Sequence, residues 1–322
     1  MTTCKHWIAG FALLAALGIA PTAEACSARF VKIVVPNPPG GSSDLIARAM
    51  GEKVGAVLGQ SVVIENRAGA STVIGADFVA KSKPDGCTIL SLTTAGVVVS
   101  VLRDKMPYDL QRDFVPIVSV GSFPMVLAVS PDSKLSSLAD VATAAKAANG
   151  ITYVSGGTGT MAHLAAARLI RELGGTGTHV PYRGNGEAIQ ALLGNHAQML
   201  FPSTADAGPL ITSGKIRILA VTSDNRLPTL PNVPTMKELG YADFTPRLWY
   251  AFVAPANTPA ESISRLHDAF ASAAKDPGIE QRLRVLGFTS EIKDSAALSA
   301  YVKAEADRWS KVIKENNIKS SD

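Results

Sequence analysis

One glycine-rich connection between a strand and a helix constrains the fold of this chain most. An apolar run at residues 31–35 predicts a buried strand, and the apolar spacing after residue 44 predicts an amphipathic helix. Glycines let a ligand approach the backbone, and the first amides of a helix have no partner within it. We therefore expect an anion site at this connection. Its candidate residues are Gly40, Gly41, Ser42, Ser43 and Asp44.

The residue types of this loop narrow the class of ligand. The loop has no lysine or arginine, and it lacks the Gly-Lys-Ser/Thr ending of a phosphate-binding loop. A small carboxylate therefore suits it better than a triphosphate. The alternative is an ordinary strand-to-helix turn in which Ser43 or Asp44 caps the helix, and for Asp44 capping is the favoured role.

The first 25 residues are typical of a secretory signal. A short polar start precedes an apolar run that is too short for a membrane span, and Ala23-Glu-Ala25 fits a cleavage site. We expect a cleaved signal peptide (residues 1–25), a mature chain that begins at Cys26, and a periplasmic location. A lipid on Cys26 is the alternative. Cys26 and Cys87 could also pair in an oxidising compartment, although the sequence does not show that they meet.

Composition and motifs argue against several functions. The 31 lysines and arginines, against 27 acidic residues, form no basic run, so we expect no nucleic-acid partner. We find neither a zinc-like Cys/His spacing nor a Gly-x-Ser-x-Gly motif. Residues 157–162 match Gly-x-Gly-x-x-Ala, but the next predicted strand, 178–182, lacks the acid that a dinucleotide site needs. We predict no enzyme activity, no catalytic residues, no cofactor and no metal.

Predicted strands and helices alternate along the chain. This order predicts an α/β fold with mostly parallel sheets, whose ligands bind beyond the carboxyl ends of strands. Thr93 and Thr94 occupy such a position. The predicted strands are 31–35, 61–65, 87–91, 114–120, 125–130, 151–155, 178–182, 198–201, 216–221 and 249–254; the predicted helices are 44–58, 73–81, 138–148, 161–173, 187–193, 235–239, 259–275, 278–286 and 295–313.

Two breaks in this pattern suggest two domains. Gly121-Ser-Phe-Pro124 interrupts an apolar run, and a proline-rich stretch begins beyond Arg226. We expect links near 121 and 225, which would give a discontinuous first domain (26–121 plus 226–322) and a second domain (122–225). The second domain has its own glycine loop between a strand and a helix. Its candidate residues are Ser155, Thr158, Gly159 and Thr160.

Several short motifs occur in a fixed order along the chain. They include Pro38-Pro-Gly-Gly-Ser-Ser-Asp-Leu-Ile-Ala-Arg48, Val63-Ile-Glu-Asn-Arg67, Tyr153-Val-Ser-Gly-Gly-Thr-Gly-Thr160, His179-Val-Pro-Tyr-Arg-Gly184 and Leu230-Pro-Asn-Val-Pro-Thr235. In this order the chain resembles the Bug-type extracytoplasmic solute-binding receptors of tripartite tricarboxylate transporters. The resemblance implies a two-domain clamshell like that of periplasmic binding proteins. Such a receptor closes on a small organic acid and delivers it to membrane permease subunits, and we expect it to act as a monomer.

The resemblance also implies how the ligand is held. In that family, backbone amides and hydroxyls of one loop per domain bind the carboxylate, and here those loops are 40–44 and 155–160. Pro202-Ser203 stands where the family commonly has Asp-Asn, and Gln198 stands where it tends to have an acid. Both lie near the expected cleft, which leaves the ligand of this member open and makes Ser203 a candidate contact.

Two further candidates each have a structural alternative. His163 either contacts the ligand or is a structural histidine, and Arg183 either pairs with a second ligand carboxylate or forms a surface salt bridge. The alternatives for the whole protein are an enzyme that acts on a small carboxylic acid and a periplasmic sensor or partner protein of the same fold. A carboxylate or histidine between the two loops would favour the enzyme.

Overall fold

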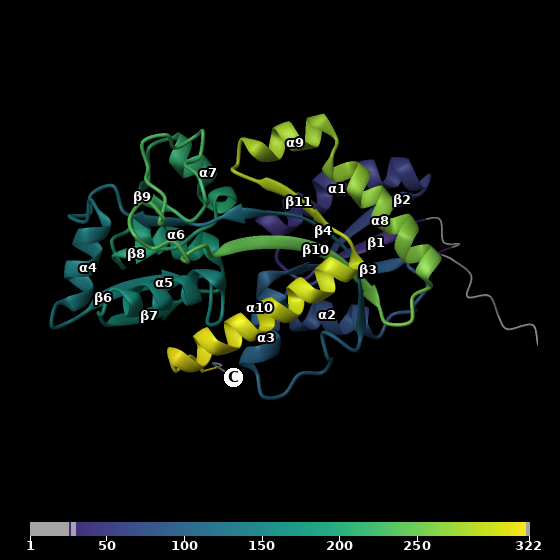
Figure 1. The fold of residues 1–322 in the computed structure, drawn as a ribbon, viewed down its shortest axis with the longest axis horizontal. Helices are drawn as coiled ribbons and strands as arrows, with labels where there is room; N and C mark the ends of the chain where they lie inside the picture. Colours follow the sequence, from purple (N-terminus) through teal and green to yellow (C-terminus); the bar gives the residue numbers. More distant parts are fainter. Residues whose placement is uncertain (1–25, 27–29, 320–322) are drawn as a thin grey trace, which may run out of the picture.

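The computed structural model describes residue 26 and residues 30–319 of the chain. The predicted signal peptide, residues 1–25, therefore lies outside the described residues. Two separate sheets organise the described part, one of six strands and one of five (Figure 1). We call each sheet, together with the helices packed on it, the first lobe and the second lobe. No helix in the described ranges has the length and apolar character to cross a bilayer.

Six strands form the sheet of the first lobe: β1 (Phe30–Val35), β2 (Ser61–Asn66), β3 (Thr88–Thr93), β4 (Phe114–Pro124), β10 (Arg247–Pro255) and β11 (Thr289–Lys293). Their order across the sheet is β11-β4-β10-β3-β1-β2. The predicted parallel arrangement holds for β1, β2 and β3. The other pairings are antiparallel, because β10 lies between β3 and β4, and β11 lies beside β4. The carboxyl ends of β1 and β3 point toward the second lobe (Figure 1).

Helices cover both faces of this sheet: α1 (Ser42–Leu58), α2 (Val73–Ala80), α3 (Thr94–Leu102), α8 (Ala260–Ala274), α9 (Pro277–Arg284) and α10 (Ser295–Glu315). In α1 the residues Ile46, Met50 and Val54 recur at helical spacing, and all three are buried in one core with α8. Burying one such side chain contributes about 1.5–3 kcal/mol. The apolar faces of α2, α3 and α10 form a second core on the opposite face of the sheet.

Five strands form the sheet of the second lobe: β5 (Val126–Val129), β6 (Ile151–Ser155), β7 (Gly177–Pro181), β8 (Met199–Leu200) and β9 (Arg217–Val221). Their order is β7-β6-β8-β5-β9, with β6, β7 and β8 parallel and β5 antiparallel to its two neighbours. The helices of this lobe are α4 (Leu138–Lys146), α5 (Met161–Glu172), α6 (Asn185–Leu193) and α7 (Thr204–Thr212). Three of them, α5, α6 and α7, begin directly after β6, β7 and β8.

The chain passes between the lobes twice, and one threonine joins the two passages. The first runs from β4 through Met125 into β5, and the second, residues 222–246, returns from β9 to β10. The buried Thr222 hydroxyl accepts a hydrogen bond from the Met125 amide (2.8 Å) and donates one to the Pro246 carbonyl (2.6 Å). Within the second passage, Met236 and Phe244 pack in the core of the second lobe.

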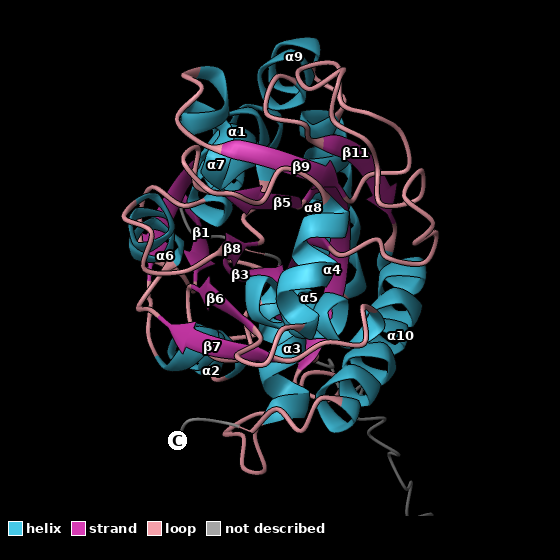
Figure 2. Ribbon diagram, turned by 90° about the vertical axis from the view of Figure 1, so that its left-hand side faces the viewer, coloured by secondary structure: helices cyan, strands magenta, loops and turns pink. Residues whose placement is uncertain are grey.

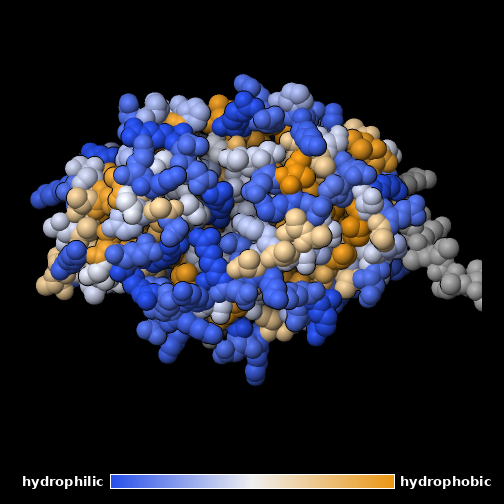
Figure 3. All heavy atoms as spheres, viewed as in Figure 1, coloured by the Kyte–Doolittle hydropathy of each residue, from blue (hydrophilic) through white to orange (hydrophobic). Residues whose placement is uncertain are grey.

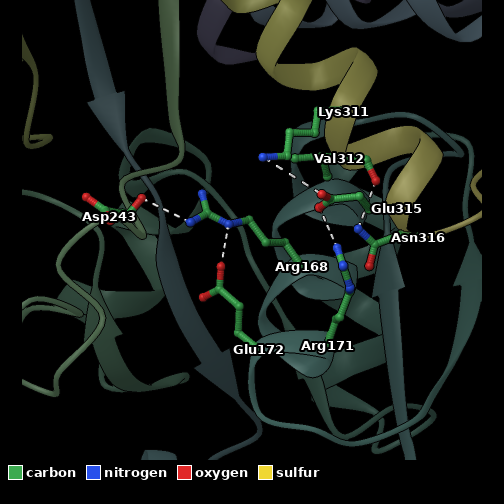
Figure 4. A network of polar contacts seen from close by, with 8 residues as sticks. All are labelled: Arg168, Arg171, Glu172, Asp243, Lys311, Val312, Glu315 and Asn316. Atoms are coloured by element: carbon green, nitrogen blue, oxygen red, sulfur yellow. Dashed lines mark hydrogen bonds and ion pairs between the residues drawn. The ribbon is translucent and has the colours of Figure 1, made fainter.

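The terminal helix α10 is a third bridge between the lobes. Its first half packs on the first lobe through Leu298 and Val302, and its second half reaches the core of the second lobe through Trp309 and Ile313. Figures 1 and 2 show it running along the outside of the molecule, across both lobes. At its end a network of charged and polar side chains joins α10 to α5 and the 222–246 passage (Figure 4). Its ion pairs are Arg171–Glu315, Lys311–Glu315 and Arg168–Glu172, and Arg168 also donates to the Asp243 carbonyl.

Four differences from the sequence predictions have a clear physical reason. β4 continues through residues 121–124. Gly121, at φ +142°, makes this possible because it has no side chain, so the backbone of Thr289 can lie directly against it. Helix α3 was not predicted, since its Gly96-Val-Val-Val99 run has weak helix propensity, and packing against α10 overrides that preference. Strand β11 was also not predicted, because residues 289–293 are largely exposed and lack an apolar pattern. The predicted helix at 235–239 is a turn instead, closed by hydrogen bonds between Thr235 and Glu238.

The two described cysteines form a disulfide. Cys26 and Cys87 are bonded, and their Cα atoms are 5.1 Å apart. This bond joins the start of the described chain to the beginning of β3, across a sequence separation of 61 residues. It favours pairing over the lipid alternative, because a sulfur in a disulfide does not carry a lipid. Figure 3 shows a mainly hydrophilic face with apolar side chains in small separate groups over both lobes.

Candidate ligand site between the lobes

The first predicted loop begins α1 without a side-chain cap. The N-cap position is Gly41, and no side chain accepts a hydrogen bond there. Asp44, which was favoured as a cap, instead accepts hydrogen bonds from the Gly40 amide (3.1 Å), Arg48 Nε (2.9 Å) and Asn66 Nδ2 (3.1 Å). Burial opposes ionisation of Asp44, but these bonds outweigh it and lower the pKa of the carboxyl. Asp44 therefore holds the loop in shape and does not cap α1, whose N-cap position is a glycine.

The second predicted loop is held by bonds within itself and by a contact of the Ser155 hydroxyl with Nε2 of His179 on β7 (2.7 Å). The Ser155 hydroxyl donates to the Gly157 carbonyl (2.8 Å) and accepts from the Gly157 amide (3.2 Å). Thr160, the N-cap of α5, donates its hydroxyl to the same carbonyl (2.8 Å). The Gly159 amide donates to Nδ1 of His163 (3.1 Å). Several groups that we expected to face a ligand are thus already paired, and Thr158 is partly exposed on this loop.

His163 lies behind this loop in an aromatic stack. Its ring is parallel to that of His179 at 3.7 Å between centroids, and the Tyr153 ring lies beside both, at 5.1 Å from His179 and 6.0 Å from His163. Burial, together with the neighbouring ring, lowers the pKa of His163 to about 3, and burial lowers the pKa of His179 to about 4. Both rings are therefore neutral near pH 7, and His163 supports the loop through its contact with Gly159.

A carboxylate that the sequence analysis did not single out faces α1 from the second lobe. Asp206, in the first turn of α7, accepts a hydrogen bond from Asn185 Nδ2 (2.7 Å), and its own amide donates to the N-cap hydroxyl of Ser203 (3.1 Å). Burial raises the pKa of Asp206, and this rise is opposed by Ser203, Asn185 and both the amide and the hydroxyl of Ser42. Since Ser42 begins α1, the two lobes meet at this carboxylate.

A buried tyrosine lies beneath the same junction. Tyr250, on β10, is 1% exposed, and its hydroxyl has no partner with full hydrogen-bond geometry in the described part of the chain. Burial and the negative charge of Asp206 raise the pKa of Tyr250, whereas Ser42 lowers it, so both groups are near the phenol oxygen. Among native proteins a buried polar atom without a partner is uncommon and marks a place where another group fits.

The junction also connects the two predicted loops. A side-chain carbon on Gly156 would come within 2.5 Å of the Asn185 side chain, so the loop after β6 packs directly on the start of α6. Asn185 in turn binds Asp206, which faces Ser42. The starts of α1, α5, α6 and α7 therefore surround one region, and the positive ends of their helix dipoles favour an anion there.

Most of the other predicted site residues have structural roles. Thr93 is buried at the start of α3, and the buried Thr94 hydroxyl donates to the Arg247 carbonyl (3.3 Å) and accepts from the Trp249 amide (3.2 Å). Ser203 caps α7, and Arg183 is exposed on the loop before α6. No group of histidine, cysteine or acidic side chains that could hold a metal occurs in the described ranges.

One of the residues missed by the sequence analysis, Asp206, had a recognisable local signal. Ser203-Thr-Ala-Asp206 is a helix-start pattern, in which a capping serine precedes an acid by three residues. It follows a strand, as the two predicted loops do. The pattern identifies a helix start, but no sequence feature showed that Asp206 would meet the other lobe. Tyr250 gave no signal beyond its place in an apolar strand.

Comparison with known proteins agrees with this architecture. Residues 46–318 match the receptor family described as the tripartite tricarboxylate transporter family receptor. Protein BugT of Bordetella pertussis is 34% identical over 99% of both chains. The solved structure of the periplasmic binding protein BugD is 33% identical, with a TM-score of 0.81 over 90% of this chain and 98% of that one. A Rhodopseudomonas palustris protein solved with adipate, Rpa4515, is 30% identical, with a TM-score of 0.83 over 90% of this chain and 97% of that one.

The fold therefore matches periplasmic binding proteins; the second predicted loop falls within the family match, whereas the first, residues 40–44, lies just before its start at residue 46. The match extends over both lobes and over α10, up to the last residues that the structure describes. The chain belongs to the family of tripartite tricarboxylate transporter receptors, the Bug-type solute-binding proteins.

Proposed function

We propose that this receptor captures a small organic acid at the junction between its lobes and presents it to the permease subunits of a tripartite tricarboxylate-type transporter. The observation that carries the proposal is the convergence of four helix starts, those of α1, α5, α6 and α7, on the region between Ser42 and Asn185. Helix starts favour anions through free amides and the helix dipole. The relative solved with adipate supports a carboxylate as the ligand class.

Movement of the lobes is part of this proposal. The two passages at Met125 and Pro246, joined by Thr222, are the places where a change of backbone angles would open the junction. The bodies that move correspond to the predicted domains, 26–121 plus 226–322 and 122–225, except that the second boundary moves from residue 225 to about residue 246. The packing of Met236 and Phe244 on the second lobe supports placing the second link near residue 246.

The same proposal includes location and processing. The sequence predicts removal of residues 1–25, and the disulfide between Cys26 and Cys87 suits an oxidising compartment such as the periplasm. Mass spectrometry of the exported protein should give a chain that starts at Cys26 without a lipid. A chain that still begins at Met1, or a lipid-modified Cys26, would contradict this part of the proposal.

One observation favours a second candidate, an enzyme that acts on a small acid. Asp206 is a carboxylate with a raised pKa between the two predicted loops, which is the arrangement a general base requires. We nevertheless propose binding without turnover, because the partners of Asp206 are the uncharged Asn185, Ser203 and Ser42. NMR of a bound acid during prolonged incubation should show it unchanged. Conversion that is lost in Asp206→Asn would establish the enzyme instead.

Gly41→Val is the direct test of the carboxylate site. A side-chain carbon at Gly41 would have only the Pro38 carbonyl within 4 Å, at 3.9 Å, and the backbone there is extended, so the variant should fold normally. The added side chain would cover the amides of Ser42 and Ser43. We expect calorimetry with the best acid from a thermal-shift screen to show at least about a 100-fold loss of affinity, which is about 2.7 kcal/mol.

Ala139→Val is the control for this experiment. Ala139 is exposed in the first turn of α4, on the outside of the second lobe. The variant should keep the affinity of the parent protein within about threefold, a difference below 1 kcal/mol. If Gly41→Val binds the acid as tightly as Ala139→Val does, the first loop is only a turn and the site assignment is wrong.

A further inference from the structure

Asp206 places a negative charge where a site for acids should have none. Its carboxylate lies at the meeting of the lobes and is held by Asn185 Nδ2 at 2.7 Å. Across the junction it faces the amide and hydroxyl of Ser42, which begin α1. The uncapped start of α1 is therefore approached by an acid that belongs to the protein itself.

The hydroxyl of Tyr250 adds an independent observation at the same place. Tyr250 is 1% exposed, and its hydroxyl has no partner of full hydrogen-bond geometry in the described ranges. The charge of Asp206 raises the pKa of this hydroxyl and Ser42 lowers it, so both groups are close to it. A phenol can donate one hydrogen bond and accept another. Asp206 keeps acceptor capacity beyond the bond from Asn185, since a carboxyl group has two oxygens and each can accept hydrogen bonds.

These groups together describe one end of a binding site. Acceptor oxygens of Asp206 and the adaptable hydroxyls of Ser42 and Tyr250 suit a ligand group that donates hydrogen bonds, such as an ammonium or a hydroxyl. A ligand carboxylate at this end would meet the carboxylate of Asp206, and two like charges at close range in a buried junction repel strongly.

We propose that Asp206 and Tyr250 determine specificity in this receptor by binding a hydrogen-bond donor of the ligand and excluding a second carboxylate. The ligand class is then a small acid with one carboxylate and an amino or hydroxyl group at its other end, rather than a plain dicarboxylate. This inference rests on the proposed function, because it describes the second end of the same site.

A matched series of acids tests the inference. The probes are unbranched acids of three to six carbons that end in an amino group, a hydroxyl or a second carboxylate, for example 4-aminobutyrate, 4-hydroxybutyrate and glutarate. By calorimetry, the parent protein should bind the best amino or hydroxy acid at least about tenfold more tightly than the dicarboxylate of the same length. Asp206→Asn should reduce this ratio to within about threefold, mainly by improving dicarboxylate binding.

Two further variants complete the design. Tyr250→Phe removes only the phenol oxygen, and it should weaken the amino or hydroxy acid more than the dicarboxylate. Asp140→Asn is the matched control, because Asp140 also follows a capping serine by three residues but lies on the outside of the second lobe. It should leave every affinity unchanged. Thermal unfolding of each variant confirms that it is folded.

The outcomes separate the two proposals. If dicarboxylates bind the parent protein as tightly as the amino and hydroxy acids, and Asp206→Asn does not change the ratio, the inference is wrong while the receptor function stands. If none of the acids binds the parent protein, the proposed function fails and the inference falls with it.

Discussion

Two helices of the second lobe begin with the same short pattern and have opposite electrostatics. α4 begins with Ser137 as N-cap and Asp140 three residues later, and α7 begins with Ser203 and Asp206. In both, the serine oxygen accepts from the amide of the aspartate, at 3.2 Å and 3.1 Å. Hydrogen bonds from Ser136 lower the pKa of Asp140, whereas burial raises the pKa of Asp206.

The difference teaches that a local motif builds the helix start but does not decide its use. α4 points its first turn to solvent, where Ser136 satisfies the carboxylate at 2.7 Å and 2.9 Å. α7 points its first turn at α1 of the other lobe, where the carboxylate loses water and gains only neutral partners. The same Ser-x-x-Asp pattern is therefore a stabilising cap in α4 and a candidate recognition element in α7.

Reversing the charge at Asp206 and at Asp140 should give the largest difference between the two positions in the free energy of unfolding. Asp206→Lys would put an ammonium against the positively polarised start of α1, without a counter-charge, and we expect a loss of about 3–5 kcal/mol in the free energy of unfolding, typical of an uncompensated buried charge. Asp140→Lys should cost clearly less, because its charge stays in water. Urea unfolding of both variants measures the difference. Equal losses would mean that the junction is open to solvent and that the comparison does not hold.

Removing the two caps should give an intermediate contrast. Ser203→Ala leaves the Asp206 amide without its partner at a fully buried position, and we expect a cost of about 1–2 kcal/mol, near the top of the range for a helix cap. Ser137→Ala should cost about 0.5–1 kcal/mol, because water replaces the exposed hydroxyl. Thermal and urea unfolding would report both values. A larger loss in Ser137→Ala would reverse the ranking and remove burial as its explanation.

Neutralising Asp206 and Asp140 should change the free energy of unfolding least. The two changes should have opposite signs. The raised pKa of Asp206 means that the folded protein loses stability as the pH rises from the ordinary aspartate range through the raised value. Asp206→Asn avoids this loss, so it should equal or exceed the parent in stability at neutral pH and lose any advantage in acid. Tyr250, the titratable group beside it, stays neutral over this range because its pKa is raised.

Asp140→Asn should behave in the opposite way. The lowered pKa of Asp140 gives the parent protein a contribution that is present above the ordinary aspartate pKa and is lost as the pH falls through the lowered value. The variant should therefore be less stable than the parent at neutral pH, and the two should converge in acid. Unfolding free energies measured from acid to neutral pH decide the matter, and curves of the same sign for both variants would contradict the assigned environments.

Much of the architecture was predictable because it depends on local patterns. The strand-to-helix units at 31–58 and 151–173 follow from apolar periodicity and glycine loops, and the structure contains both as β1–α1 and β6–α5. Where tertiary packing overrode local preference, the prediction was wrong. α3 forms through a valine run, and β4 runs on through Gly121 because the backbone of β11 lies close beside it.

The candidate site was predictable only in part, for the same physical reason. The sequence alone determined where most helices begin, because this depends on neighbouring residues, but it wrongly favoured Asp44 as the cap of α1. It also determined the receptor family, through motifs in fixed order. Only the tertiary structure decided that the polar groups of the second loop bind one another. It also decided that Asp44 accepts hydrogen bonds from Arg48 and Asn66, and that Asp206 faces Ser42. Charge and solvation at a site depend on the distance to groups far away in the chain, and only the meeting of the two lobes sets that distance.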